Sequence, residues 1–386
     1  MQTRMKTEEI TAGASTIPSN SHFAPAYSIL KDAMAARAFP GCAFGIFADG
    51  RVVLQDALGR STYHSDAFTV TAETVYDVAS ITKVVATTAS AMLLAQRGIL
   101  DLDTPLGELL PGFVVGRSSS GRARSVTIRH LLAHNSGLPG YVELFRTTTT
   151  PDGLLRACLQ LPLEAEPGTR AEYSDPGFIL LGKALEVLTR ESLATWAQRE
   201  IFDPLQLTAT GFNPPPGLRS LIPPTEEDSA LRHRRIQGEV QDENAWALKG
   251  VAGHAGVFSN VPDLLGFAGG ILNAGRVGEN AAGLAEPLFS KPIVDEFAKR
   301  QGPEGSSRAL GWDTPSGNSS AGHYFSERSI GHLGFSGCSL WIDLDKGVAV
   351  VLLTNRTWPD RESQLIRQAR PAFHDAVREA LKSIYG

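Results

Sequence analysis

Residues 77–83 of this chain read Asp77-Val78-Ala79-Ser80-Ile81-Thr82-Lys83, and they run directly into an apolar segment, residues 84–94. The apolar side chains of that segment recur at helical spacing, and Gly98 is placed to end a helix. We therefore expect a buried helix with Ser80 in its first turn and Lys83 one turn later on the same face. This position suits a nucleophile, because the N–H groups at a helix N-terminus favour negative charge and burial lowers the pKa of a neighbouring amine.

The serine–lysine spacing on its own is not specific. Ser28 and Lys31 have the same spacing, and we interpret that pair as part of an exposed helix face. Ser80 differs because an apolar helix follows it and because two further polar motifs come after it in the chain.

The composition of the 386-residue chain is that of a globular protein, with 42% hydrophobic and 20% charged residues. Its length is sufficient for a large core and two lobes. The net charge of -5 comes from interspersed charges of both signs, which predicts neither a nucleic-acid nor an anionic-membrane partner. One basic cluster, residues 232–235, is followed by acidic side chains and is interpreted as a solvated loop.

No apolar run approaches the ~20 residues of a membrane-spanning helix, and residues 1–21 lack the apolar region of a signal peptide. We therefore expect a cytoplasmic protein, or a periplasmic one if a leader has been removed. Cys42, Cys158 and Cys338 are odd in number and widely spaced, so they predict neither a disulfide framework nor a metal site. None of these features predicts the oligomeric state.

The chain is expected to contain a flexible tail and two lobes. Residues 1–22 are the tail, residues 23–100 and 251–386 form an α/β lobe, and residues 101–250 form a mainly helical lobe. The Asp-Gly pair at 49–50 lies between two apolar segments and predicts a hairpin. Strands at both ends with helices between them predict an α/β (α+β) fold, in which an antiparallel β-sheet is flanked by helices and a helical lobe is inserted. The cleft between the lobes is the expected place for a site.

Two further motifs follow Ser80 and Lys83. The first is Tyr173-Ser174-Asp175, after a Pro-Gly turn that would present it on a loop, and the second is His332-Leu333-Gly334, in an expected strand. In this order the motifs resemble the S-x-x-K, Y-x-N and K-T-G signatures of the class C β-lactamase-like serine hydrolases. That group includes D-alanyl-D-alanine carboxypeptidases and family VIII esterases. The resemblance covers residues 24–358.

The resemblance implies a β-lactamase/transpeptidase-like fold and an acyl-transfer site without a cofactor. Ser80 would be the nucleophile, Lys83 would assist its deprotonation, and Tyr173, its pKa lowered by the nearby ammonium, would be a phenolate base. Which of the two groups holds the proton at each step stays open. The backbone N–H groups of Ser80 and Phe335 would form the oxyanion hole, and Gly334 would allow the backbone to approach the substrate closely.

Two departures from the signatures bear on the substrate. His332 replaces a lysine and is mostly neutral at pH 7 with an ordinary pKa of ~6.5, and Leu333 lacks the hydroxyl of threonine. Asp175 adds a negative charge where an amide would bind a substrate carbonyl. We therefore expect neutral esters to be favoured over anionic β-lactams.

The first hypothesis is a carboxylesterase acting on short-to-medium acyl esters. The alternatives are a β-lactamase or D-alanyl-D-alanine carboxypeptidase with the same site, and a non-hydrolytic penicillin-binding or sensor protein that acylates and stalls.

Four other residues admit more than one interpretation. His254 lies between glycine-rich segments and would either approach the cleft or cap a turn, and Trp312 would either line an acyl pocket or pack in the core. His130 and His134 share a helix face, but the glutamate and third ligand of a zinc site are missing, so we expect a structural role and no metal. The sequence contains no G-x-S-x-G elbow and no dinucleotide fingerprint, so it predicts neither an α/β-hydrolase nor a cofactor.

Overall fold

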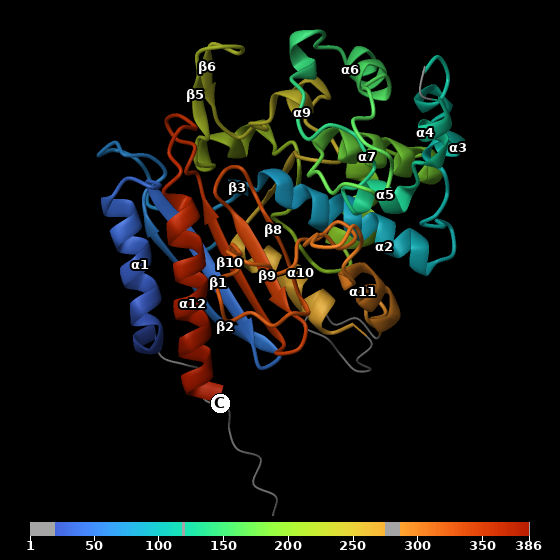
Figure 1. Ribbon diagram of the computed structural model, residues 1–386. Coiled ribbons are helices and arrows are strands. Elements are labelled where there is room, and N and C mark those ends of the chain that lie inside the picture. The colour runs from blue at the N-terminus through green and yellow to red at the C-terminus, as the bar shows by residue number, and fades with distance from the viewer. Residues whose placement is uncertain (1–19, 118–119, 275–285, 386) are drawn as a thin grey trace, which may run out of the picture.

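The computed structural model describes residues 20–117, 120–274 and 286–385 of the chain (Figure 1). Most of the expected N-terminal tail lies outside these residues. Asn20–Phe23 form a 3₁₀ turn that leads into the first helix, α1 (Ala24–Ala35). The expected fold class, an antiparallel sheet flanked by helices with further helices inserted, is confirmed.

A five-stranded antiparallel sheet joins the two ends of the chain, in the order β2-β1-β10-β9-β8 (Figure 1). Its strands are β1 (Gly41–Ala48), β2 (Arg51–Gly59), β8 (Ser329–Leu333), β9 (Ser339–Asp343) and β10 (Val348–Thr354). The hairpin predicted from the Asp-Gly pair is the β1–β2 hairpin. β1 also pairs with β10, so strands from the two termini lie side by side at the centre of the sheet.

Helices cover both faces of the sheet. This explains why β1 and β10 are apolar along their whole length and do not alternate between apolar and polar residues. Phe44 and Val350 belong to the face under α1 and the C-terminal helix α12 (Ile366–Tyr385), which lie next to each other in Figure 1. Val351 belongs to the opposite face, which α10 (Val261–Leu272) covers.

The remaining α-helices and strands of the described chain are mostly short. The helices are α2 (Ala89–Gln96), α3 (Leu106–Leu109), α4 (Ser120–Ser125), α5 (Ile128–Leu132), α6 (Pro151–Leu159), α7 (Asp175–Thr189), α8 (Leu193–Ala197), α9 (Glu243–Ala247) and α11 (Lys291–Ala298). A small sheet has the order β3-β7-β4, and a separate hairpin pairs β5 with β6. These strands are β3 (Tyr76–Asp77), β4 (Gly211–Phe212), β5 (Glu226–Asp228), β6 (Arg234–Ile236) and β7 (Val257–Ser259). Within the described ranges, no helix is both long and apolar enough to cross a membrane.

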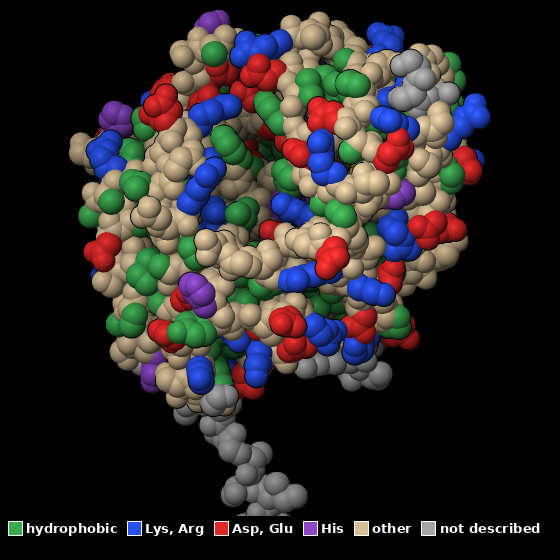
Figure 2. All heavy atoms as spheres, in the orientation of Figure 1, with side chains coloured by type: hydrophobic (Ala, Val, Ile, Leu, Met, Phe, Trp, Pro, Cys, Tyr) green, Lys and Arg blue, Asp and Glu red, His purple; other side chains and the backbone are tan. Residues whose placement is uncertain are grey.

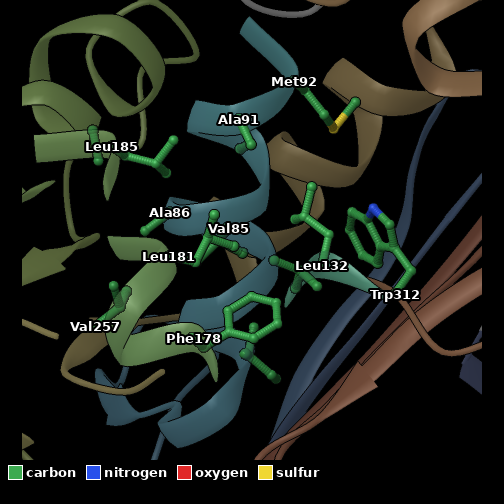
Figure 3. Packing of buried hydrophobic residues seen from close by; sticks show 14 of the residues in the cluster. Val85, Ala86, Ala91, Met92, Leu132, Phe178, Leu181, Leu185, Val257 and Trp312 are labelled. Carbon is green, nitrogen blue, oxygen red and sulfur yellow. The ribbon is translucent and has the colours of Figure 1, made fainter. Parts of the chain in front are cut away.

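The helix expected after Ser80 is present and buried, but it does not begin as an α-helix. Ala79–Ile81 form a 3₁₀ turn, Lys83–Thr88 form a π-helical segment, and α2 follows. Hydrophobic periodicity could not predict this, because turns of 3₁₀, α and π type differ too little in period over so few residues. Figure 3 shows the buried surroundings of this helix, with labelled side chains of Val85, Ala86, Ala91, Met92, Leu132, Phe178, Leu181, Leu185, Val257 and Trp312.

Substitution of Phe44 by alanine should lower the free energy of unfolding by about 3–5 kcal/mol. The ring is fully buried and lies 5.2 Å from the ring of Tyr27 in α1 and 5.6 Å from that of Phe373 in α12, between centroids. The smaller side chain therefore leaves a cavity beneath both helices. Urea denaturation measures the effect. Val115→Ala, at a side chain that is 69% exposed, is the control and should change the stability by less than about 0.5 kcal/mol.

Candidate active site

The three predicted motifs meet in one cleft. A cavity of about 750 Å³ is lined by Ser80, Tyr173, Asp175, His332 and Gly334, which are separated by up to some 250 residues in the sequence but adjacent in the fold. Figure 2 shows the hollow in the face of the molecule and the Lys and Arg side chains that gather around it. The structure therefore brings the expected site residues together.

Lys83 contacts two residues of the cleft lining, Ser80 and Asp175, and has no exposed side-chain surface. Its Nζ donates to Ser80 Oγ at 2.9 Å, to Asp175 Oδ1 at 2.7 Å and to the backbone carbonyl of His254 at 3.0 Å. An ammonium group has three N–H donors, and all three are used here. The geometry is therefore that of a charged lysine held in a fixed position beside the serine hydroxyl.

The electrostatic state of Lys83 differs from the sequence expectation. Burial by itself lowers the pKa of the amine, as expected, but the Asp175 carboxylate and then Tyr173 raise it, and the net pKa lies above its ordinary value. The expectation of a lowered pKa was wrong because it did not include Asp175. Asp175 lines the cleft, as expected, and its carboxylate also forms an ion pair with the fully buried lysine.

Tyr173 also differs from the expectation. Burial raises the pKa of its phenol, and although the Lys83 ammonium lowers it, the net pKa is above the ordinary value. The phenol is therefore protonated at neutral pH, and the expected phenolate is not the resting form. The Lys83 Nζ lies 4.8 Å from the centre of the Tyr173 ring. The centre of the His134 ring lies 4.6 Å from that of the Tyr173 ring, and the two ring planes are tilted by 35°.

The start of α7 fixes the second motif. Ser174 is the N-cap of this helix, and its hydroxyl accepts the N–H of Gly177 and donates to the carbonyl of Pro139. Its backbone N–H donates to Nδ1 of His134 at 2.9 Å, which agrees with the structural role expected for that histidine. Asp175 is therefore the first residue of a helix and not a loop residue as expected, and its carboxylate is held at the helix N-terminus.

The turn that carries Ser80 is held by Asp77. One carboxylate oxygen accepts the N–H of Ala79 and the other accepts the N–H of Gln241, both at 2.8 Å. Burial raises the pKa of Asp77 to about 6, against the lowering effect of these two hydrogen bonds. Ala79 has a positive φ of 47°, a conformation that a non-glycine residue adopts only when its surroundings impose it.

The third motif lies against this same turn. A Cβ built on Gly334 would come within 2.4 Å of the carbonyl oxygen of Val78, so contact with the Ser80 turn by itself requires a glycine here, a reason that the sequence expectation did not include. Ser336 Oγ donates to the carbonyl of Asp77 at 2.7 Å and strengthens this contact. Ser80 and Phe335, whose N–H groups were expected to form the oxyanion hole, both line the cavity.

His332 lines the cleft, as expected, and is neutral. Burial, and then the charges of Lys83 and Arg308, place its pKa well below the ordinary value. Its Nδ1 lies 2.8 Å from the carbonyl of Leu333, which requires the proton to be on Nδ1 and leaves Nε2 as an acceptor. Nε2 has no hydrogen-bond partner among the described protein groups. The third motif therefore presents a neutral acceptor where the K-T-G signature presents a cation.

His254 and Trp312, which were expected either to reach the cleft or to have a structural role, are both buried outside the cleft lining. His254 contributes its backbone carbonyl to Lys83, and its ring Nε2 lies 2.8 Å from Asp242 Oδ1. Trp312 is 1% exposed and stacks with Phe267 in the core, so it does not line an acyl pocket. Its burial is a tertiary contact that the local sequence around it does not predict.

Sequence analysis missed a group of arginines in the cleft lining. They are Arg308, Arg356, Arg361, Arg367 and Arg370. No motif marks them, because they come from a loop before β8, from the segment after β10 and from the first turns of α12, and only the fold assembles them. Among the described residues there is no group of three or more His, Cys, Asp or Glu side chains suited to a metal ion, and the three cysteines are free and buried.

Comparisons with known proteins found a matching family, curated relatives and solved structures of similar fold. The family described as Beta-lactamase matches residues 27–372. The chain is 29% identical over 355 residues to the N-acetylmuramyl-L-alanine amidase of Bacillus subtilis (strain 168), covering 83% of this chain and 78% of the relative. It is 30% identical over 354 residues to a Salmonella typhi protein named "Putative D-alanyl-D-alanine carboxypeptidase", covering 82% and 79%. The solved structure titled "EstCE1, a hydrolase with promiscuous acyltransferase activity" has a TM-score of 0.75 at 21% identity, covering 93% of this chain and 99% of the other, and shows a shared fold.

Substitution of Gly334 by alanine should lower the free energy of unfolding by about 1–3 kcal/mol, because the new methyl group overlaps the Val78 carbonyl and must push β8 away from the Ser80 turn. Thermal or urea denaturation measures the change. Gly217→Ala is the matched control, since a Cβ there meets nothing within 4 Å, and it should leave the stability unchanged or slightly increased. Equal effects of the two substitutions would show that the Gly334–Val78 contact is not constrained.

Proposed function

Because the chain belongs to the β-lactamase family, we propose that it is a serine hydrolase that forms an acyl-enzyme on Ser80 and hydrolyses it. The observation that supports this most strongly is the continuous contact from Ser80 Oγ to Lys83 Nζ to Asp175 Oδ1 at 2.9 and 2.7 Å. A serine hydroxyl is a weak nucleophile and needs a base at hydrogen-bond distance. Lys83 is at that distance, and the Tyr173 hydroxyl also interacts with Ser80.

The first step is the attack of Ser80 Oγ on the substrate carbonyl carbon. Lys83 is an ammonium in the resting protein, so it must first release a proton to solvent, and it then accepts the proton of Ser80 as the bond from Oγ to carbon forms. The negative charge that develops on the carbonyl oxygen is stabilised by the N–H groups of Ser80 and Phe335. The Lys83 ammonium formed in this step adds to that stabilisation.

The second step is the departure of the leaving group. Tyr173 is protonated and interacts with both Lys83 and Ser80, so its hydroxyl is the proposed acid that protonates the leaving oxygen or nitrogen as its bond to carbon breaks. Lys83 then returns a proton to Tyr173. In deacylation, water attacks the acyl-serine, passes its proton to the same pair of groups, and Ser80 is regenerated as the acid product leaves.

We propose a carboxylic ester of short or medium acyl length as the first candidate substrate. The support is the neutral, acceptor-only His332 and the absence of a lysine from the third motif, which gives an anionic β-lactam no cation at that position. The second candidate is an amide or D-alanyl peptide. It is supported by the amidase and carboxypeptidase names of the relatives and by the protonated Tyr173, because an amine leaving group depends on an acid more than an alkoxide does.

The test of the proposed function is covalent labelling combined with a substrate comparison. A fluorophosphonate should add once to the protein, on Ser80, as shown by mass spectrometry of peptides. Ser80→Ala should lower ester turnover by at least about 1,000-fold without changing the melting temperature by more than a few degrees. Labelling of another residue, or retained turnover in Ser80→Ala, would contradict the proposal.

The substrate comparison uses p-nitrophenyl butyrate, a chromogenic cephalosporin and a D-Ala-D-Ala peptide. We expect the highest kcat/KM for the ester. A higher value for the peptide would favour the amide candidate, and acylation without turnover of any of the three would favour the non-hydrolytic sensor.

Asp175→Asn should move the rise of kcat/KM with pH to lower pH. Asp175 raises the pKa of Lys83, so the neutral amine that accepts the Ser80 proton becomes populated only at high pH in the wild-type protein. Removing the negative charge lowers that pKa, and the active neutral form is then reached at a lower pH. The measurement is the pH dependence of ester hydrolysis for both proteins.

Glu172→Gln is the control for this prediction. It removes a carboxylate from the same cleft lining, but Glu172 forms no hydrogen bond or ion pair with Lys83. Its pH profile should shift much less. A profile that is the same in wild type and Asp175→Asn would show that the ionisation of Lys83 does not limit acylation.

A further inference from the structure

Two arginines are buried in the cleft without an acidic partner. Arg356 follows β10 and is 6% exposed, and Arg370 lies in the first turns of α12 and is 4% exposed. Both line the same cavity as Ser80, together with the more exposed Arg367. A guanidinium group is almost never buried this deeply unless an opposite charge accompanies it.

Their hydrogen bonds go to backbone carbonyls. Arg370 Nη2 donates to Gly337 at 2.8 Å, and its Nε is buried with no partner among the described protein groups. Arg356 donates through Nε to Phe335 and through Nη1 to two carbonyls of the following loop. Within the described residues no carboxylate lies within 4.0 Å of Arg356, Arg367 or Arg370. The positive charge of this group is therefore not neutralised by the protein.

Three other arginines of the same chain differ from Arg356 and Arg370 because they pair with carboxylates. Arg232, with 1% of its side chain exposed, pairs with Asp228 at 2.8 Å, and Arg378 pairs with Asp343 at 3.2 Å. Arg361, at the same end of the cleft, contacts both Glu226 and Glu243. Each of these three arginines therefore has a carboxylate partner, which Arg356 and Arg370 lack.

The charges of these arginines also affect one another. Burial, with a smaller contribution from the charge of the nearby Arg367, lowers the pKa of Arg356 to about 10 and that of Arg370 to about 10. Both groups remain cationic at neutral pH. Two buried cations that repel each other destabilise the empty cleft, and an anion placed between them removes that repulsion.

We infer that Arg356 and Arg370, with Arg367 at the rim, form a subsite for a carboxylate group of the substrate. The donors assigned to such a group are Arg370 Nε, which is buried without a partner, and the N–H groups of Arg356 that make no backbone hydrogen bond. A guanidinium suits a planar carboxylate. The subsite rests on the proposed function and narrows its substrate class from neutral esters to acyl compounds that carry a carboxylate away from the scissile bond. It supplies, from α12 and the segment after β10, the cation that the third motif lacks.

The test compares two esters of similar length that differ in charge. One is p-nitrophenyl butyrate, and the other is mono-p-nitrophenyl glutarate, whose acyl chain ends in a carboxylate. We expect the wild-type protein to have the higher kcat/KM for the glutarate ester. The ratio of the two values should fall at least about tenfold in Arg370→Met and in Arg356→Met, the effect of losing one charge-assisted hydrogen bond.

Arg328→Met is the matched control, because Arg328 is a surface arginine paired with Asp295 and Asp345 outside the cleft lining, and it should leave the ratio unchanged. A second measurement does not depend on the folding of the arginine variants or on turnover. In calorimetric titrations, glutarate should bind Ser80→Ala protein at least about tenfold more tightly than neutral glutaramide does. Inorganic phosphate is titrated in parallel.

The outcomes separate the two proposals. Equal ratios in wild type and both cleft variants, with equal binding of glutarate and glutaramide, would overturn the subsite. Phosphate binding that depends on Arg370, without preference for the glutarate ester or for glutarate, would show that the arginines hold a free anion and would also overturn it. Preferential glutarate binding by a protein that hydrolyses neither ester would uphold the subsite and contradict the proposed ester hydrolysis.

Discussion

The charge of Lys83 is buried at the junction of three separate segments, and each of them has to be in place for that charge to be tolerated. The ammonium donates to Ser80 of its own turn, to Asp175 at the start of α7 and to the backbone carbonyl of His254 in the loop before β7. A buried ammonium that lacks these partners destabilises a protein by several kcal/mol. The packing of α7 and of the β7 loop against the Ser80 helix therefore serves the fold and the site at the same time.

A second set of contacts aligns the sheet with that centre. The turn that carries Ser80 is held by Asp77, the carbonyl of Asp77 accepts the hydroxyl of Ser336, and Gly334 allows the end of β8 to approach Val78. The two N–H groups proposed for the oxyanion hole come from the two sides of this contact. Their separation is therefore set by backbone packing and does not depend on a mobile side chain.

The distribution of charge in the cleft differs from that of the signatures that the sequence resembles. Asp175 brings a full negative charge to the lysine, and His332 brings a neutral acceptor to the third motif. The positive charge is placed farther along the cleft, on Arg356 and Arg370, which are held by backbone carbonyls. The arginines come from other elements than Ser80, Lys83 and Tyr173. A substitution of an arginine can therefore change which substrate charge is preferred without altering the residues around Ser80.

The local pattern of the sequence determined the hairpin, the apolar strands β1 and β10, the buried helix after Ser80 and the order of the three motifs. These features depend on residues close together in the chain, or on spacings that a strand or helix imposes by itself. The family resemblance then indicated which distant motifs would meet, and the fold brings them to one cleft.

Only the tertiary structure decided the protonation states and the surroundings of the site. Lys83 and Tyr173 were expected to have lowered pKa values, and both are raised, because the sign depends on the balance between burial and a carboxylate 92 positions away from the lysine. The role of Gly334, the burial of Trp312 and the unpaired arginines likewise depend on contacts between remote segments. Burial and long-range electrostatic interactions are properties of the assembled fold, and no local pattern of residues encodes them.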